Sequence, residues 1–332
     1  MPFIEGEVIV GVDTHTDTHT AVVIDLLGRQ LGVLEITTTS AGYQQLLCWA
    51  RSHGIVNCAG VEGTGAYGAG LARFLAEHAV TVFEIDRPNR QHRRRHGKSD
   101  PADAHAAAKA VLAGDAGFAK STTGTVEAIR CLHLVRRSAV KAKTQAGNQI
   151  KDLIVTAPEP VRDELRRLKT PARVRTAARW QITQIDDPAT ASRHAIATLA
   201  RRWLQLHAEV RELEKKIWPL LRQLAPTLLA EPGVALDVAA KLIIAAGENP
   251  HRLHSDGAFA ALCGTSPVEA TSGKRQNRHR LNRGGNRQAN NALHTVVLHR
   301  SRHHAETRAY IERRRQEKLT DPEIWRCLIG RV

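Results

Sequence analysis

The chain has 332 residues, of which 48 are Lys or Arg and 33 are Asp or Glu, giving a formal net charge of +15. This length is enough for two domains with separate cores. So basic a chain is expected to bind a polyanion, nucleic acid before an anionic membrane. The most apolar run, residues 234–247, is too short and too charged to span a bilayer, and no signal peptide is recognisable. Five scattered cysteines predict reduced thiols in a cytoplasmic protein.

Apolar runs near the N-terminus alternate with helix-like segments. Three strands joined by short links predict an antiparallel meander, and two further strands each follow or precede a helix. The predicted strands are residues 7–13, 21–25, 31–36, 55–61 and 80–85, and the predicted helices are 40–53, capped by Ser40, and 67–78. This order, followed by an acid-bearing helix, is typical of a ribonuclease-H-like α/β fold.

The acid-bearing helix begins near Asp100 and continues through the alanine-rich residues 104–112. We expect Asp100 at the N-cap, Pro101 at the first helical position and Asp103 at the third. Residues three apart share a helix face, so the two carboxylates can point toward one place. Alone, such a pair is also typical of simple helix capping.

Two more acids stand where ribonuclease-H-like chemistry requires them. Asp13 ends the first strand and Glu62 ends the fourth. Each could be an ordinary turn residue, but with Asp100 and Asp103 they supply four oxygen donors that can hold two hard divalent cations, Mg²⁺ or Mn²⁺. Two such ions about 3.5–4 Å apart clamp an in-line phosphoryl displacement. We therefore predict a metal site from the convergence of the four acids.

A basic stretch, residues 87–98, separates the last strand from the acid-bearing helix. It contains six Lys or Arg and no acid. A solvated charge run is one interpretation. Because the stretch adjoins the predicted metal site, we favour contact with the phosphate backbone. The residues predicted to make this contact are Arg90, Arg93, Arg94, Arg95 and Lys98.

The middle of the chain predicts two long helices. Apolar residues recur at helical spacing over 126–153, and a heptad seam with spacings of three and four covers 196–224. The seam could pack on the first helix within one chain or form a coiled coil between protomers, the alternative we favour. Pro219 makes the last turn of the second helix doubtful, and residues 170–190 are poorly patterned.

The C-terminal part combines a phosphate-binding turn with a basic tract. Residues 232–235 resemble a degenerate helix-hairpin-helix turn, although Ala235 stands where glycine is usual. Residues 270–318 contain 13 Lys or Arg against three Glu, and the absence of aromatic residues between 270 and 308 favours phosphate clamping over base stacking. The predicted contacts include Lys274, Arg275, Arg278, Arg280, Arg283 and Arg287.

Taken together, these motifs resemble the DEDD transposases of the insertion-sequence one-ten group, relatives of the Piv-type DNA invertase. The matching stretches are residues 11–15, 61–68, 89–104, 262–274 and 277–290. The resemblance implies a RuvC-like catalytic domain over 1–120 carrying Asp13, Glu62, Asp100 and Asp103, a helical coiled-coil middle over 121–225, and a mainly helical transposase domain over 226–332. Thr16 departs from the family pattern, where lysine is common, and the chain ends earlier than many relatives.

The resemblance also implies a function: a transposase or site-specific recombinase of an insertion sequence, cutting and rejoining DNA in the nucleoid. The family's C-terminal serine nucleophile matches Ser272 here. Family members are guided by a structured non-coding bridge RNA, and their dimers pair into tetramers around donor and target DNA. Mg²⁺ or Mn²⁺ at the acids would activate the serine hydroxyl, and Lys274, Arg275 and Arg278 could stabilise charge in the transition state.

Other interpretations stay open at the level of sequence. Thr271 and Ser266 are neighbouring hydroxyls that could replace Ser272 as nucleophile. A RuvC-like nuclease of the Holliday-junction resolvase kind would use activated water and need no serine. A nucleic-acid-binding protein with a decayed site would not cut at all. A sugar-kinase or actin-like ATPase is more remote, because no second glycine-rich nucleotide loop follows residues 11–16.

Overall fold

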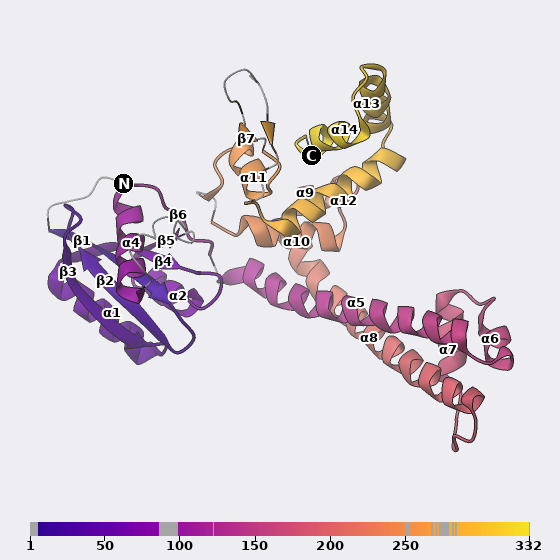
Figure 1. The fold of residues 1–332 in the computed structure, drawn as a ribbon. Helices are drawn as coiled ribbons and strands as arrows, with labels where there is room; N and C mark the ends of the chain where they lie inside the picture. The colour runs from indigo at the N-terminus through magenta and orange to yellow at the C-terminus, as the bar shows by residue number, and fades with distance from the viewer. Residues whose placement is uncertain are drawn as a thin grey trace. The chain divides into compact units, whose positions relative to one another are not determined.

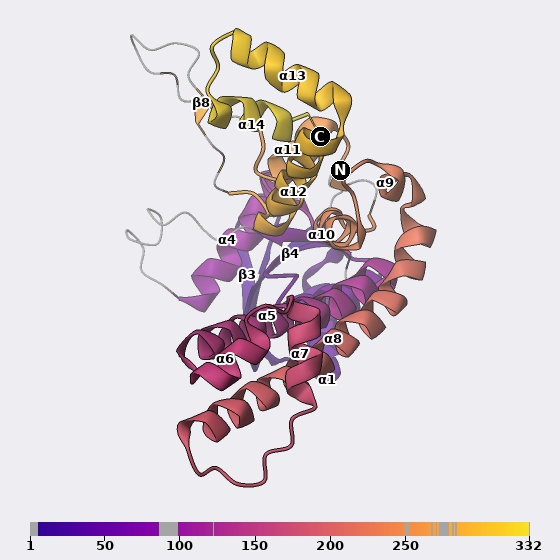
Figure 2. The ribbon, with the colours of Figure 1, turned by 90° about the vertical axis from the view of Figure 1, so that its right-hand side faces the viewer.

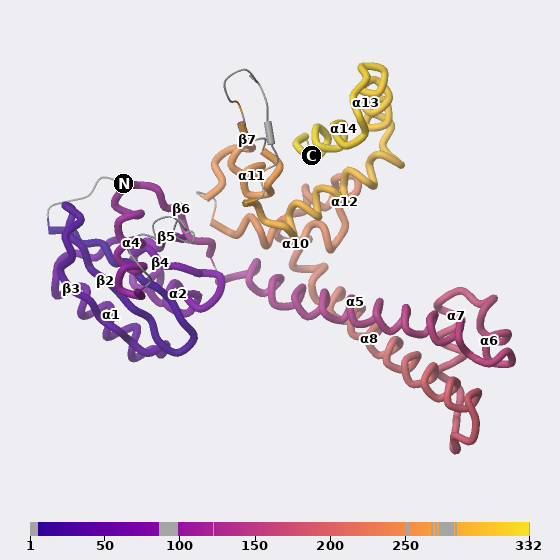
Figure 3. Tube along the Cα trace, viewed as in Figure 1, coloured from indigo at the N-terminus to yellow at the C-terminus, as the bar shows by residue number. Residues whose placement is uncertain are grey.

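A computed structural model describes residues 6–85, 99–121, 123–249, 252–266, 268–269, 271, 279–280, 282 and 284–331. Spatial contacts divide the chain into two compact units (Figures 1 and 3). Unit 1 is Met1–Glu127 with Ala245–Arg287, and unit 2 is Ala128–Ile244 with Gln288–Val332. This grouping does not test the three domain boundaries predicted from the sequence, which stay predictions.

The centre of unit 1 is a six-stranded mixed sheet in the order β3-β2-β1-β4-β5-β6. The first three strands form an antiparallel meander, β4 and β5 run parallel to β1, and β6 closes the edge antiparallel to β5. The strands are β1 Glu7–Thr14, β2 Thr18–Ile24, β3 Gln30–Thr37, β4 Ile55–Glu62, β5 Thr81–Ile85 and β6 Gly117–Phe118. The predicted five strands are confirmed, and the mixed α/β sheet is compatible with a ribonuclease-H-like domain. The two-residue β6 was not predicted, because it is too short to give a pattern.

Helices cover both faces of this sheet. On one face α1 (Ser40–His53) and α2 (Ala69–Glu77) bury alternate residues of β1, among them Val8, Val10 and Val12. On the other face α4 (Asp100–Leu112) packs over Ile9 and its neighbours. Successive residues of a strand point to opposite faces, so β1 is apolar on both and reads as a continuous hydrophobic run.

Two glycines bring α4 unusually close to the sheet. A Cβ on Gly11 of β1 would lie 2.0 Å from the Ala104 carbonyl oxygen, and one on Gly60 of β4 would lie 2.8 Å from that of Ala107. The facing positions of α4 are alanines, of which Ala104 and Ala108 are fully buried. Small residues on both surfaces therefore fix the helix directly over β1 and β4, and this contact determines where its acidic first turn lies.

Two predicted N-caps are wrong by one residue. The N-cap of α1 is Thr39, whose side chain accepts a hydrogen bond from the Gly42 amide, and not Ser40. The N-cap of α4 is Ser99, so Asp100 is the first residue inside the helix. The Asp103 amide donates to the Ser99 carbonyl at 3.1 Å, which places the first helical hydrogen bond one residue earlier than predicted. Asp100 is therefore not the N-cap, although Asp100 and Asp103 both lie in the first turn, where acids complement the helix dipole.

Unit 2 is built on two long helices, α5 (Gly124–Thr156, beginning in unit 1) and α8 (Pro188–Leu224). They run antiparallel, since Ile150 packs in the same cluster as Ile196, whereas Arg136 pairs with Glu214 much farther along α8. The short helices α6 (Glu159–Leu165) and α7 (Thr170–Ala178) complete the core at one end of this hairpin (Figures 1 and 2). The poorly patterned region, residues 170–190, thus contains α7 and the first residues of α8.

The heptad seam of α8 packs partly within the chain. Ile196, Leu199 and Trp203 lie in the cluster shared with α5, which is the intrachain alternative weighed for the seam. The helix continues through Pro219 to Leu224, so the doubt about its last turn was unfounded. Proline is tolerated there because it removes only one backbone hydrogen bond near the helix end.

The remaining elements are short. In unit 1, α11 (Asp256–Leu262) precedes a two-stranded ribbon of β7 (Val268–Glu269) and β8 (His279–Arg280). In unit 2, α9 (Pro226–Ala230) and α10 (Leu236–Ala246, whose last two residues belong to unit 1) flank the predicted hairpin turn. The C-terminal helices are α12 (Arg287–His303), α13 (Ala305–Gln316) and α14 (Asp321–Ile329), with Val297, Ile324 and Leu328 in their core.

Candidate functional site

Strand register places two of the predicted acids at one end of the sheet. In the parallel pair of β1 and β4, Gly11 lies opposite Gly60 and Val12 opposite Val61. Asp13 and Glu62 come one residue later on each strand. Because side chains alternate, both acids lie on the same face as the two glycines, which is the face covered by α4. The Thr14 hydroxyl also donates to the Glu62 carbonyl oxygen at 2.8 Å and ties the two strand ends together.

Helix α4 brings the other two acids to this end of the sheet. One Asp13 carboxylate oxygen lies 3.3 Å from Nε2 of His15, and one Asp100 oxygen lies 3.4 Å from the same nitrogen. Donor atoms of these three side chains all lie within 4.8 Å of one another. Asp103 follows one turn after Asp100 and is buried, as is Asp13. Asp13 and Asp100 therefore meet as the sequence predicted, although their roles are not tested by this geometry.

The sequence reasoning did not identify His15 as a site residue. His15 directly follows β1 and is two residues from Asp13, a spacing that places both side chains on one side of an extended chain. An Asp-x-His pair at the end of a buried strand was the available signal. Burial lowers the pKa of the neighbouring His19, against the opposing effect of its hydrogen bond to the Thr18 carbonyl oxygen.

The donor set fits a divalent cation. Carboxylate oxygens and an imidazole nitrogen are both common metal ligands. Asp13 is buried, and a buried carboxylate close to a second one favours a compensating positive charge. The His15 Nε2 atom is itself buried and makes no hydrogen bond to any residue that the structure describes. A cation coordinated by these groups would satisfy both requirements.

Most of the other predicted site residues lie outside the described residues. These are Ser272, Arg90, Arg93, Arg94, Arg95, Lys98, Lys274, Arg275, Arg278 and Arg283. For Arg280 only the backbone is described, in β8, and Arg287 is exposed at the start of α12. Of the alternative hydroxyl residues, Thr271 is exposed and Ser266 is half-buried.

The base of the segment that contains Ser272 is tightly closed. The Asn286 amide donates to the Leu262 carbonyl oxygen at 2.6 Å. A Cβ on Gly285 would lie 2.2 Å from the Gly264 amide nitrogen, so only glycine permits this backbone contact. The two ends of the segment are thus held together in unit 1, the unit that also carries the acids.

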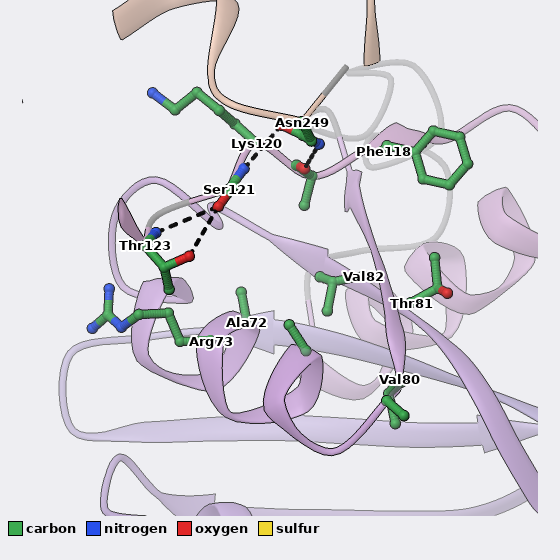
Figure 4. A pocket seen from close by; sticks show the side chains of 13 residues that line it. Ala72, Arg73, Val80, Thr81, Val82, Phe118, Lys120, Ser121, Thr123 and Asn249 are labelled. Atoms are coloured by element: carbon green, nitrogen blue, oxygen red, sulfur yellow. Dashed lines mark hydrogen bonds between the residues drawn. The ribbon is translucent and has the colours of Figure 1, made fainter. Parts of the chain in front are cut away.

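A separate pocket of about 380 Å³ lies against α2, β5 and β6 (Figure 4). Asn249 closes one side, accepting from the Ser121 amide at 3.2 Å and donating to the Ala119 carbonyl at 2.8 Å. The described residues that line it include Arg73 and Lys120 but no carboxylate. This pocket is therefore distinct from the acid cluster.

Comparison with known families decides the identity of the chain. Residues 10–157 match the DEDD transposase profile of the IS110 group, and residues 225–312 match that of the transposase IS116/IS110/IS902 family. The chain belongs to this transposase family. It is accordingly a DNA transposase or recombinase of an insertion sequence. No curated protein matches the chain significantly. Among the described residues, no helix is long and apolar enough to cross a membrane.

Proposed function

We propose that this transposase cuts and rejoins DNA at a RuvC-like site in which Asp13, Glu62, Asp100 and Asp103 hold Mg²⁺ or Mn²⁺. The observation that carries the proposal is the meeting of Asp13 and Asp100 around His15. These acids are far apart in sequence, and a structural role would not require them to converge on one face. Bound cations would polarise the scissile phosphate and favour the deprotonated nucleophile.

Ser272 is the proposed nucleophile. Its Oγ attacks the scissile phosphorus, forming a P–Oγ bond while the bond to one deoxyribose oxygen breaks. The serine proton passes to a base, and the departing strand end gains a proton and becomes a free hydroxyl. A strand-end hydroxyl then attacks the phosphoserine, restoring a phosphodiester and returning the proton to Ser272. The close backbone contact between Gly264 and Gly285 supports this proposal, because it holds together the two ends of the segment that contains Ser272.

The basic tracts are proposed to hold the nucleic acids. Arg90, Arg93, Arg94, Arg95 and Lys98 would contact phosphates beside the acids, because the chain runs from this tract directly into α4. Lys274, Arg275 and Arg278 flank Ser272 in sequence and would stabilise charge on the attacked phosphate. The group Arg280, Arg283 and Arg287 would contact the DNA backbone.

The finer partners follow from the family resemblance. We infer that a bridge RNA guides donor and target choice, and that dimers pair into tetramers around the two DNAs. The chain's charge of +15 is compatible with binding both RNA and DNA. Part of the α8 seam, including Leu220 and Leu224, is half-buried or exposed within the chain and could contribute to a coiled coil between protomers.

A strand-exchange assay with donor DNA, target DNA and the flanking non-coding RNA tests this proposal. Ser272→Ala should abolish strand exchange and the covalent protein–DNA product, and Thr271→Ala is the matched control that should retain both. Exchange that persists in Ser272→Ala refutes the serine role. Cleavage without exchange in that variant favours the RuvC-like nuclease, the alternative that the acid cluster would serve equally well. Wild-type protein that shows no metal-dependent cleavage indicates a decayed site.

A further inference from the structure

We propose that His15 is a nitrogen ligand of the cation held by Asp13 and Asp100, and that it makes this site selective for a transition-metal ion such as Mn²⁺ over Mg²⁺. The inference rests on the proposed function, since it concerns the ion of the same acid site. It changes the donor set from oxygen alone to oxygen with imidazole nitrogen.

The separations of the donor atoms fit one coordination sphere. The His15 nitrogen lies 3.3 Å from an Asp13 oxygen and 3.4 Å from an Asp100 oxygen. Adjacent ligands of an octahedral ion with bonds of about 2.1 Å are about 3 Å apart. These two pairs therefore need to close by only a few tenths of an ångström, which side-chain rotation supplies, and the Asp13 and Asp100 donor atoms lie within 4.8 Å of each other.

The backbone holds His15 where its ring can reach the acids. Its amide donates to the Thr18 carbonyl at 3.1 Å, closing the turn between β1 and β2. The preceding Thr14 is hydrogen-bonded to the end of β4. The Nε2 atom is buried although 42% of the side-chain surface is exposed. The ring therefore directs its coordinating edge inward and leaves its other edge toward solvent.

The chemistry of imidazole sets the expected selectivity. Mg²⁺ prefers oxygen ligands and gives up its waters reluctantly. Transition-metal ions accept imidazole nitrogen more readily. Replacing one oxygen or water ligand by His15 should therefore strengthen Mn²⁺ binding more than Mg²⁺ binding. His15 also lies between two carboxylates, so a competing possibility is that it moves away when a cation enters.

Pulsed electron paramagnetic resonance of Mn²⁺ bound to the full-length chain distinguishes these outcomes. Directly coordinated imidazole gives a ¹⁴N coupling, which should be present in the wild type and change to a ¹⁵N coupling when histidine is ¹⁵N-labelled. This measurement requires no variant and so does not depend on whether a variant folds. Mn²⁺ binding without a nitrogen coupling would overturn the proposal and support displacement of His15.

Two variants assign the nitrogen to its residue. His15→Ala should remove the coupling and weaken Mn²⁺ binding by about tenfold or more, measured by titration calorimetry, while Mg²⁺ affinity changes much less. His105→Ala is the matched control, because this α4 histidine lies 3.4 Å from the Gly28 carbonyl and should keep the signal. A coupling retained in His15→Ala, or equal losses for both ions, contradicts the proposal.

The same titration separates this inference from the proposed function. Asp13→Asn should weaken binding of both ions, because it removes an oxygen donor that either ion would use. If Asp13→Asn binds both ions as tightly as the wild type does, the proposed metal site at the acids is refuted. If it binds both weakly but the wild type gives no nitrogen coupling, only the role of His15 fails.

Discussion

Each unit contains a cluster of carboxylate and basic side chains, and the two clusters differ in the partners of their carboxylates. In unit 2, Asp237 of α10 accepts from His133 at 3.0 Å, Arg136 at 2.9 Å and Lys241 at 2.7 Å. In unit 1, Asp13 and Asp100 instead share the imidazole of His15. Asp237 is surrounded by side chains that donate to it, whereas the imidazole nitrogen of His15 is a group that can coordinate a metal ion.

The number of hydrogen-bond donors around Asp237 makes it an unsuitable metal ligand. The hydrogen bond from His133 and the nearby Lys241 hold the pKa of Asp237 well below its usual range. Its lone pairs are occupied by three donors, so a cation would find little affinity there. Arg136 also bonds Glu214 of α8 at 2.7 Å, and the cluster thus joins α5, α8 and α10. Asp237 thus ties three helices together, whereas the Asp13 and Asp100 carboxylates meet at the imidazole of His15.

The largest expected effect is a loss of activity, without a matching loss of stability, when Asp103 of unit 1 is replaced. Asp103→Asn should reduce metal-dependent strand exchange by about a thousandfold or more, since metal clamping supplies several kcal/mol of transition-state stabilisation. The free energy of unfolding without metal should change much less than the activity, because asparagine keeps the size and shape of this buried side chain. Exchange assays and denaturant unfolding measure the two quantities.

Asp25→Asn is the control for that experiment. Its carboxylate bonds Arg29 and two backbone amides in a surface turn of the same unit, so exchange should be unchanged. Undiminished exchange in Asp103→Asn would remove this acid from the site. A large loss of stability would instead place it in the structural class with Asp237.

The packing of α4 is the second target. Gly11→Ala should destabilise unit 1 by about 3 kcal/mol or more, because the added Cβ overlaps backbone atoms that cannot move independently. Any protein that folds should also bind metal weakly, since Asp100 shifts with the helix. Gly117→Ala is the control, as a Cβ there meets nothing within 4 Å. Equal unfolding midpoints for the two variants would contradict the close contact of α4 with β1.

Much of unit 1 was predictable because its signals are local. Apolar runs identify the strands, and the end of each run identifies Asp13 and Glu62 as strand-end acids. The N-cap of α4 was predicted one residue too late because Ser99 and Asp100 both suit a helix N-terminus. His15 was missed because an Asp-x-His pair alone is a weak signal, and Asp100, the second acid that it contacts, comes from another element.

The cluster around Asp237 shows the other limit of sequence reasoning. Asp237 and Lys241 are the charged residues of the apolar run 234–247, which was considered from the sequence only as a candidate membrane span. Two opposite charges four residues apart on an apolar helix do indicate an internal ion pair. Their partners on α5, His133 and Arg136, could not be predicted, because helical periodicity gives the face of a helix and not the helix it meets.

A moderate effect is expected from breaking the unit 2 cluster. Asp237→Asn should lower the free energy of unfolding by about 2 kcal/mol, less than the loss of a fully buried pair because 39% of this side chain is exposed. The control is Asp163→Asn, which removes an exposed pair with Arg166 on α6 and should change stability very little. Metal affinity at the acid site should not change in either variant. A selective loss of Mn²⁺ binding in Asp237→Asn would contradict the division between structural and functional carboxylates.

The smallest effect is a pH dependence that belongs to unit 2. Because the folded-state pKa of Asp237 is lowered from an unfolded value of about 3.9, its stabilisation is fully present above about pH 5. It is lost progressively as the pH falls below about 4 and the folded carboxylate becomes protonated. Denaturant unfolding followed by tryptophan fluorescence should therefore show a steeper acid-side loss in the wild type than in Asp237→Asn. The difference between the two proteins should shrink toward zero at the lowest pH, since both then carry a neutral group. A constant difference across this range would mean that the asparagine disturbs packing and that the charge of Asp237 contributes little.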